Sequence, residues 1–397
     1  MVQKRNLVPM SSPDLEQSDI EAVLSTLQTN YLSIGPKIRI FEDMFCEFTG
    51  AKHAIGVNSG TAGLHLCVRA AGIQQGDYVI TTPFSFVSSS NVILFEKAIP
   101  VFVDVDPQTG NIDAEQAAQA AEDIRSGKAK RASQWMPRQG ADASGHLRSI
   151  LPVDVFGQPA DYNKLQTVAA KHGLTLIEDS CEALGAMYEG KPAGMLGDSG
   201  VFAFYPNKQI TTGEGGMIVT NNDAFAERMR ALRNQGRAPG DTWLQHTYLG
   251  YNYRMDEMSA ALGISQMERV EKLLQKRQQV ADWYNQKLGT IKGVETPYIS
   301  PATFRMSWFV YVIRLDPSLN RDRVADLLID AGIPVRPYFL PIHLQPYIAS
   351  QFGYREGDYP VTEDLGRRSL AVPFSGIMTE TQVDLVCEVI EKTLSLL

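Results

Sequence analysis

The sequence has no apolar run of the roughly 18 residues needed to cross a membrane. Its best candidate, residues 92–105, is broken by three charged residues and a proline. Basic residues are too few for a general nucleic-acid binder, because 37 Lys and Arg face 45 Asp and Glu. Only four cysteines occur in 397 residues, without a CxxC pair, and residues 1–19 contain no signal-peptide pattern. We therefore expect a cytoplasmic protein with reduced thiols and neither a membrane nor a nucleic-acid partner.

Several motifs that would assign a chemistry are also absent. No strand is followed by a GxGxxG dinucleotide fingerprint, and no GxSxG nucleophile turn occurs. Residues 185–191 come close to a GxxxxGK phosphate loop, but Pro192 stands where that loop needs a hydroxyl group. The six histidines show neither HxxH nor HxxxH spacing. We therefore expect no dedicated metal site.

Short apolar runs alternate with helical patterns through the first two-thirds of the chain. The expected strands are 53–57, 78–81, 100–103, 150–155, 175–178, 201–204 and 217–220. This alternation predicts an α/β fold with a mostly parallel sheet covered by helices on both faces. In such sheets ligands bind at the carboxyl ends of the strands.

The pattern changes near residue 255. One long connector helix is expected from residue 256 to about 288. This helix is followed by a strand at 308–315, a helix at 321–331, an extended segment at 334–337 and a terminal helix at 380–396. We divide the chain into a large domain, 1–255, and a connector helix with a small α+β C-terminal domain, 256–397.

A basic insertion, residues 124–150, separates a predicted helix from the following strand. It holds six Arg or Lys and a single acidic residue, Asp142, and has no apolar periodicity. We interpret it as an exposed, partly flexible loop. Two roles stay open: a solvated insertion, or a contact surface for an anionic ligand or a partner subunit.

Chemically active side chains gather at the ends of the predicted strands. Asp179 ends one strand, and Lys208 follows another just before a glycine-rich turn. A lysine removed from water at such a place becomes a better nucleophile. Residues 59–62 open a helix after the first strand, where backbone N–H groups and the helix dipole form an anion site. An anion site, an aromatic, a carboxylate and a lysine together indicate a site for pyridoxal 5′-phosphate.

Each feature also has an ordinary structural explanation. Asp179 and Thr61 are residue types that cap helices, and most lysines in a chain are surface residues. The joint occurrence of these residues at strand ends favours the chemical interpretation.

The sequence resembles the pyridoxal-phosphate-dependent sugar aminotransferases of the DegT/DnrJ/EryC1/StrS family over nearly its whole length. The segments that carry the resemblance are 31–36, 41–42, 58–62, 152–157, 178–183, 204–209, 213–216, 250–255 and 341–343. It implies the aspartate aminotransferase type I fold and an obligate homodimer with shared active sites. It also implies transfer of an amino group from L-glutamate to a nucleotide-linked keto sugar for a polysaccharide, lipopolysaccharide or glycosylated metabolite. A non-nucleotide keto sugar as acceptor, or a non-catalytic regulator on the same fold, is the alternative.

The resemblance also implies catalytic roles for individual residues. Lys208 matches the lysine that joins the cofactor and then moves a proton, and no histidine replaces it as in the related dehydratases. Asp179 matches the carboxylate that keeps the pyridine nitrogen protonated. Glu182 stands near the cofactor's 3-hydroxyl, where relatives often have Gln or His. A carboxylate favours a nearby proton on the ring, and an amine can act as general acid and base.

The remaining implied contacts hold the cofactor and the substrate. Phe86 matches the aromatic that stacks on the pyridine ring, and Gly60, Thr61 and Ala62 match the segment whose backbone amides bind the phosphate. Asn252 matches a residue that reaches the phosphate from the partner subunit. For the sugar nucleotide we expect Arg336 and His343 to supply contacts, because the fork of an arginine can bind two oxygens of a diphosphate. Ala203 replaces a serine that donates to the phosphate in many relatives.

Overall fold

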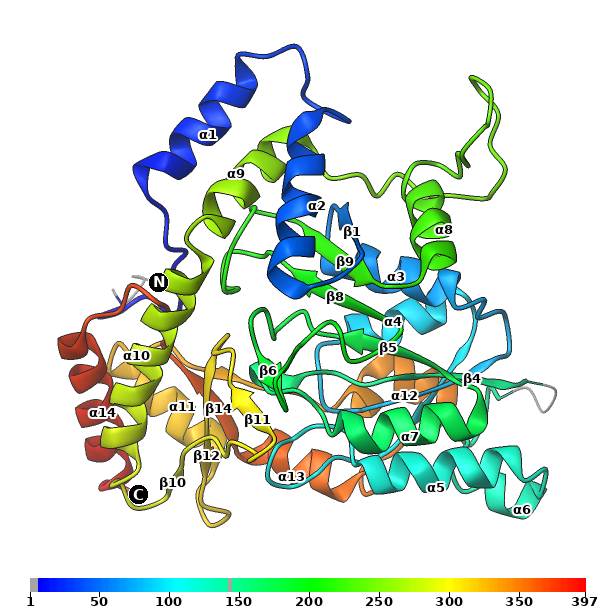
Figure 1. The fold of residues 1–397 in the computed structure, drawn as a ribbon. Helices are drawn as coiled ribbons and strands as arrows, with labels where there is room; N and C mark the ends of the chain where they lie inside the picture. The colour runs from blue at the N-terminus through cyan, green and yellow to red at the C-terminus, as the bar shows by residue number, and fades with distance from the viewer. Residues whose placement is uncertain (1–5, 142–144) are drawn as a thin grey trace.

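The computed structural model describes residues 6–141 and 145–397, and a seven-stranded sheet forms its centre (Figure 1). Its strands are β1 (His53–Val57), β2 (Tyr78–Thr81), β3 (Ile99–Phe102), β4 (Leu147–Leu151), β5 (Thr175–Asp179), β8 (Ser199–Ala203) and β9 (Gly216–Thr220). Their order in the sheet is β1-β9-β8-β5-β4-β2-β3. Only β9 runs against its neighbours, and the other six strands share one direction. The predicted mostly parallel sheet is confirmed.

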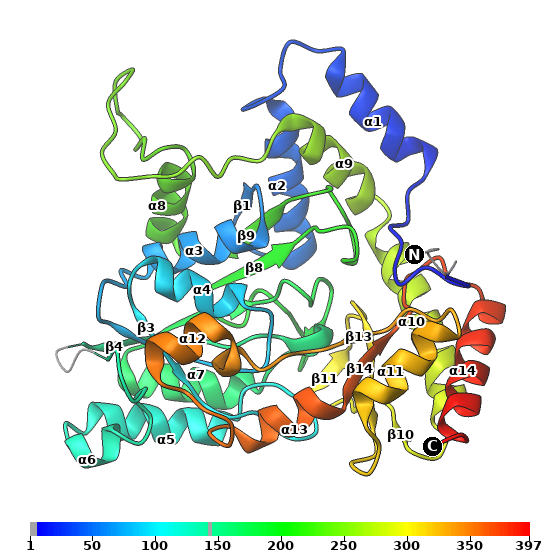
Figure 2. The same ribbon diagram turned by 180° about the vertical axis from the view of Figure 1, so that it is seen from behind.

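Helices cover both faces of this sheet (Figures 1 and 2). They are α2 (Pro36–Thr49), α3 (Gly60–Ala70), α4 (Ser88–Phe95), α5 (Ala114–Arg125), α7 (Tyr162–His172), α8 (Asp223–Arg233) and α9 (Glu257–Met267). Successive strand side chains point to opposite faces. Val201 therefore packs with α3, α4 and α8, whereas Phe202 packs with α2 and α9. The half of the sheet around β2 and β4 packs against α5 and α7.

A second, four-stranded sheet lies in the C-terminal part, at the lower left of Figure 1. Its order is β10-β12-β14-β13, with β10 (Val294–Glu295), β12 (Tyr311–Leu315), β13 (Arg336–Pro337) and β14 (Ser369–Val372). Three helices pack on it: α10 (Val270–Leu288), α11 (Arg321–Asp330) and α14 (Glu380–Leu394). The α+β character expected for this part is present. Strand β14 and the helices α12 (Pro346–Phe352) and α13 (Pro360–Arg368) have no counterpart among the predicted elements.

The connector differs from the single helix expected over 256–288. It consists of α9 and α10, with a break at Glu268 and Arg269. Ion pairs are formed at this break. The guanidinium of Arg269 donates to Asp14 at 2.8 Å and to Asp19 at 2.6 Å. A division into 1–255 and 256–397 stays a proposal. Segments pass between its two parts, since β11 (Thr303–Arg305) pairs with β6 (Met187–Tyr188) and α12 packs with the large sheet (Figure 2).

The basic insertion is less detached than expected. A short helix, α6 (Ala129–Ala132), forms within it, and the Trp135 indole N–H donates to Asp123 of α5 at 3.0 Å. Arg138 donates through both terminal nitrogens to the carboxylate of Asp358. These contacts tie the first half of the insertion to the core, so the expectation of a flexible loop is corrected there. Asp142 lies outside the described residues.

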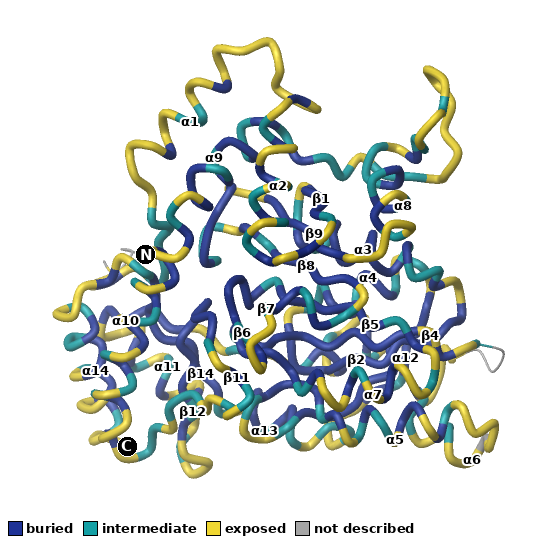
Figure 3. Tube along the Cα trace, viewed as in Figure 1, coloured by how far each residue is buried: buried dark blue, intermediate teal, exposed yellow. Residues whose placement is uncertain are grey.

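The distribution of exposed residues is uneven (Figure 3). Buried residues run through the central sheet, whereas the long loop after α8 extends away from the body and is mostly exposed. Within residues 6–141 and 145–397, no helix combines the length and the apolar character that a bilayer crossing requires.

Candidate active site

The carboxyl end of β1 leads into α3, whose first turn can receive an anion. Ser59 caps this helix, its hydroxyl accepting the N–H of Ala62 at 3.1 Å, so Thr61 is not the cap. Instead, the hydroxyls of Thr61 and Ser88 share a hydrogen bond of 2.9 Å between the starts of α3 and α4. A Cβ atom at Gly60 would lie 2.7 Å from the Cβ of Ala203, so only glycine allows this close approach. Free backbone donors and two hydroxyls thus meet at one point.

Asp179 lies at the carboxyl end of β5 and is buried. One carboxylate oxygen accepts the Ser89 hydroxyl at 2.7 Å, and the other accepts the N–H of Cys181 at 3.2 Å. No helix follows β5 directly, since the next element is β6, so the capping explanation is wrong for Asp179. Both oxygens of Asp179 are therefore held in place by donors from neighbouring segments.

Lys208 follows β8, and its side chain is only 12% exposed. Its Nζ lies 3.7 Å from the centroid of the Phe309 ring and 3.7 Å from Oε1 of Glu182. Burial raises the pKa of Glu182 above its ordinary value, against the opposing effect of Lys208. The other carboxylate oxygen of Glu182 accepts the N–H of Phe156 at 2.9 Å. Lys208 is therefore an enclosed amine and not a surface lysine.

The loop that carries Lys208 is held by a buried arginine that sequence reasoning missed. Arg277 of α10 donates to the carbonyl groups of Asn207 and Lys208 with one nitrogen. Its other terminal nitrogen donates to the carbonyls of Trp308 and Phe309, at 3.3 and 3.2 Å. Burial lowers the pKa of Arg277 to about 10. The sequence signal for Arg277 was its position on the apolar face of the predicted connector helix, where a charged residue is unusual.

The segment between β2 and α4 supplies further side chains. Phe86 is 64% exposed, and its carbonyl group accepts the Ser85 hydroxyl at 2.9 Å. Ser88 and Ser89, which contact Thr61 and Asp179, were not predicted. Their signal is the run of three serines, 88–90, two residues after Phe86. A large exposed ring next to these polar groups offers a face for a planar ligand.

Beneath Asp179, two buried carboxyl groups share one proton with a serine. The Ser180 hydroxyl lies 2.9 Å from both Asp154 Oδ2 and Glu178 Oε1, yet a hydroxyl has a single hydrogen to donate. Glu178 also accepts the N–H groups of Gly194 and Leu196, which lower its pKa, although burial raises that pKa overall. We infer that Asp154 holds the proton and donates to Ser180, which donates to Glu178. Burial raises the pKa of Asp154 well above its ordinary value, and the charge of Glu178 adds to this rise.

Among the described residues, the hydrogen bonds of Asn252 do not involve Lys208, Asp179 or Thr61, although its segment lies beside Asn58, just before the cap of α3. The side chain of Asn252 is exposed, and its carbonyl group accepts from the amide of Asn58 at 3.4 Å. The segment around it pairs with Asn234 through an isolated bridge. A role at a cofactor site of the same protomer has no support from these contacts.

The two residues expected at the substrate differ from each other. Arg336 is exposed on β13. His343 is fully buried, with Nε2 at 3.0 Å from Glu363, and burial lowers its pKa. Burial raises the pKa of the neighbouring Tyr338 to about 12, and the charge of Glu182 adds to this rise whereas that of Arg336 opposes it. Of the two, Arg336 alone presents a side chain to solvent, and His343 can act on a substrate only through the segment that it holds.

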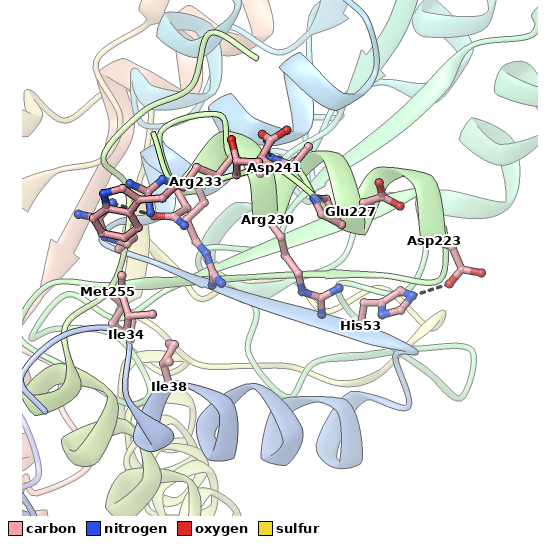
Figure 4. Close-up of a pocket in the computed structure, with 17 residues that line it drawn as sticks. Ile34, Ile38, His53, Asp223, Glu227, Arg230, Arg233, Asp241 and Met255 are labelled. Atoms are coloured by element: carbon pink, nitrogen blue, oxygen red, sulfur yellow. Dashed lines mark hydrogen bonds and ion pairs between the residues drawn. The ribbon is translucent and has the colours of Figure 1, made fainter. Parts of the chain in front are cut away.

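A large cavity lies elsewhere, with a volume of about 750 Å³ (Figure 4). It is bounded by α8, the start of α2 and the loop after α8, and Arg230 and Arg233 extend from α8 toward β1 within it. Neither Lys208 nor Asp179 lines it, whereas Arg254 and Met255, close to Asn252, do.

The chain was compared with known proteins. A model of the DegT/DnrJ/EryC1/StrS aminotransferase family matches residues 13–391. The chain is similar to GDP-perosamine synthase of Caulobacter vibrioides, with 37% identity and 98% of each chain covered. It is also similar to the spore coat polysaccharide biosynthesis protein SpsC of Bacillus subtilis, at 34% identity with 98% of each chain covered. A solved DegT DnrJ EryC1 StrS aminotransferase from Brucella abortus has a TM-score of 0.84 at 29% identity, covering 94% of this chain and 95% of the other.

The protonated Asp154 gives a test of stability against pH. An unfolded aspartate titrates near pH 4, whereas folded Asp154 keeps its proton to higher pH. Its contribution to the free energy of unfolding is therefore complete below about pH 4 and is lost as the pH rises toward the folded-state pKa. Asp154→Asn donates to Ser180 without a titratable proton. Thermal unfolding of the cofactor-free variant should therefore depend less on pH, between about pH 5 and 8, than that of the wild type.

The control is Asp282→Asn, which changes an exposed carboxylate on α10. This variant should keep the wild-type pH dependence. Parallel curves for the wild type and Asp154→Asn would show that Asp154 is ionised in the folded chain.

Proposed function

We propose that this chain, which belongs to the DegT/DnrJ/EryC1/StrS aminotransferase family and is a pyridoxal-phosphate-dependent sugar aminotransferase, transfers an amino group from L-glutamate to a nucleotide-linked keto sugar. The observation that carries this proposal is the meeting of Lys208, Asp179 and the start of α3 at one edge of the sheet. Similarity to a relative named for GDP-perosamine synthesis supports a nucleotide-linked acceptor. A relative named for spore coat polysaccharide supports a role in surface polysaccharide, lipopolysaccharide or glycosylated-metabolite biosynthesis.

The chemistry of the side chains present fits pyridoxal phosphate. When bound, this group supplies an electron sink for the carbon that gains or loses the amino group. The start of α3 with Gly60, Thr61 and Ala62 would hold the phosphate. The hydroxyl of Ser88, bonded to Thr61, offers a donor that Ala203 does not supply.

The other residues would orient the ring and move protons. Asp179, oriented by its donors, would hold the ring nitrogen in its protonated form. Phe86 would cover one face of the ring, and Glu182 would lie at the 3-hydroxyl. Lys208 would take a proton from the substrate carbon and return it, and its Nζ is oriented for this by Phe309 and Glu182.

The active form is proposed to be a homodimer with shared sites. Three apolar side chains of the loop after α8 are largely exposed, namely Trp243 at 79%, Leu244 at 71% and Leu249 at 81%. Ile34, on the opposite side of the large cavity, is 62% exposed. Apolar surface of this extent is typical of a protein interface. A second copy covering it would bring the exposed Asn252 close to the partner's cofactor site.

The acceptor's diphosphate needs a local positive charge, because the chain as a whole carries −8. Arg336 is the favoured contact for the diphosphate. His343 would support the segment that follows Arg336. Arg138 of the basic insertion is already paired with Asp358, which leaves the insertion a minor role. The four cysteines are free thiols, which suits the cytoplasmic location proposed for the enzyme.

Lys208→Ala tests the catalytic assignment. The variant should fold and lose turnover by about 10³-fold or more, because it lacks both the nucleophile and the proton carrier. Formation of 2-oxoglutarate from L-glutamate is measured with UDP-, dTDP-, GDP- and CMP-linked keto sugars and with a free keto sugar. Lys171→Ala, an exposed control on α7, should keep full turnover. Substantial transfer by Lys208→Ala would refute the assignment, and a preference for the free sugar would refute the nucleotide-linked acceptor.

Mixed dimers test the shared site. Lys208→Ala and Asn252→Ala homodimers should each be inactive or weak, since every site lacks one group. When equal amounts reassort, about a quarter of the wild-type activity should return, because half of the dimers then contain one intact site. Activity that stays absent after confirmed reassortment would place Asn252 in the site of its own protomer.

Arg336→Ala tests the acceptor contact. The KM for the keto sugar should rise about tenfold or more through loss of a charged contact to the diphosphate, whereas the KM for glutamate should change much less. Arg138→Ala is the matched control and should leave both constants within about threefold, because it removes an exposed ion pair. The reverse ranking of the two variants would make the insertion the specificity element.

A further inference from the structure

A partly buried polar cluster adjoins the segment that carries Asn252. The rings of Tyr251 and Tyr253 stack, with centroids 4.9 Å apart and an angle of 10° between their planes. His65 of α3 packs against both, at centroid distances of 4.8 and 5.9 Å. We call these three residues, together with Arg69 and Glu96, the His65 cluster.

Glu96, at the end of α4, is the centre of the hydrogen bonds in this cluster. Its Oε1 lies 2.7 Å from His65 Nε2 and 3.3 Å from the Tyr251 hydroxyl, and its Oε2 accepts from Arg69 at 2.6 Å. His65 Nδ1 lies 3.1 Å from the Tyr253 hydroxyl. With Nε2–H donating to Glu96, Nδ1 is left to accept from Tyr253. Both tyrosines are thus connected to one carboxylate.

The charges in the cluster agree with these hydrogen bonds. Burial acts to raise the pKa of Glu96, but the hydrogen bonds from His65 and Arg69 outweigh it and hold this pKa below its ordinary value. Burial lowers the pKa of His65, although Glu96 opposes this effect. A charged Glu96, a charged Arg69 and a neutral His65 form a stable arrangement.

The backbone geometry connects the cluster to Asn252. The N–H of Tyr251 donates to the carbonyl of Leu232 at 2.7 Å, and that of Tyr253 donates to Arg233 at 3.1 Å. Alternate side chains of an extended segment point to opposite sides. Since both tyrosines are directed inward, Asn252 between them is directed outward, where its side chain is exposed.

We propose that Glu96 is a positioning residue that acts through His65, Tyr251 and Tyr253 to fix the orientation in which Asn252 meets the partner's cofactor. This inference rests on the proposed function, and on the role of Asn252 in trans within it. None of the five residues of the His65 cluster is among those assigned above to the cofactor or the substrate. The cluster holds the exposed side chain of Asn252 in one direction. Binding of the cofactor's phosphate then does not lose the entropy of ordering this side chain.

One other route of action needs to be distinguished. His65 lies four residues beyond Thr61 on α3, about 6 Å along the helix axis. Loss of Glu96 could therefore disturb the anion site of the same protomer. The two routes differ in the subunit that is affected.

The first measurement is the affinity for pyridoxal phosphate itself. Glu96→Ala should raise its dissociation constant about tenfold, as expected for a lost charged hydrogen bond. Tyr253→Phe, which removes one hydroxyl and keeps the ring, should raise it about threefold. Arg368→Ala is the matched control, because it removes a partly buried ion pair with Asp364 in the C-terminal part, and it should leave the affinity unchanged. Unchanged affinity in Glu96→Ala would overturn the proposal.

The second measurement uses mixed dimers of Glu96→Ala with Lys208→Ala, which are separated from both homodimers by a different affinity tag on each subunit. Borohydride fixes the cofactor to Lys208, so only the subunit that carries Glu96→Ala is labelled. The Asn252 that serves this subunit comes from the Lys208→Ala partner, whose cluster is intact. We expect the mixed dimer to be labelled at the same cofactor concentrations as the wild type.

The outcomes of this experiment separate the alternatives. If the mixed dimer still needs more cofactor for labelling than the wild type does, Glu96 acts within its own protomer and the proposal is overturned. Tyr253→Phe, tested in the same way, answers the question if Glu96→Ala does not fold. Failure of the proposed function has a different signature, because the wild-type dimer would then take up label but form no 2-oxoglutarate from L-glutamate with any of the nucleotide-linked keto sugars.

Discussion

The shared direction of six strands is the constraint on which the site depends. Their carboxyl ends form one edge of the sheet, and each of three strands brings a different group to that edge. β1 delivers the start of α3, β5 delivers Asp179, and β8 delivers the loop with Lys208. The exception, β9, returns in the opposite direction and contributes none of them. Reversal of β5 or β8 would move its group to the far edge of the sheet.

The position of Lys208 depends on the C-terminal part as well. β8 ends at Ala203, five residues before the lysine (208 − 203), so the strand alone does not fix its side chain. Arg277 of α10 holds the carbonyl of Lys208, and Phe309 lies against its amine. A buried arginine left without these carbonyl groups would be costly, which makes the arrangement hard to deform. The central sheet and the C-terminal part therefore meet at Lys208.

Alternation of strands and helices was sufficient to predict the parallel sheet, because each short apolar run implies burial on both faces. Lys208 and Asp179 were found since they directly follow or end such runs. Prediction was poorer where local pattern and tertiary contact differ. β4 ends at Leu151 and not at residue 155, because residues 155–157 form a 3₁₀ turn there. Ser89 and Arg277 act through contacts 90 and 69 residues away in sequence, and no periodicity reports such pairs.

His343 and Asn252 show why a residue's place in a motif does not determine its exposure. Both lie in segments that carry the family resemblance, yet His343 is enclosed with Glu363 whereas Asn252 is open to solvent. The difference follows from the backbone: His343 lies in a short turn beneath aromatic side chains, and Asn252 is the outward member of an extended triplet. α3 connects this triplet to the anion site, because its first turn carries Thr61 and its second carries His65. One helix would thus support the proposed phosphate site of its own subunit and, through the proposed dimer, that of its partner.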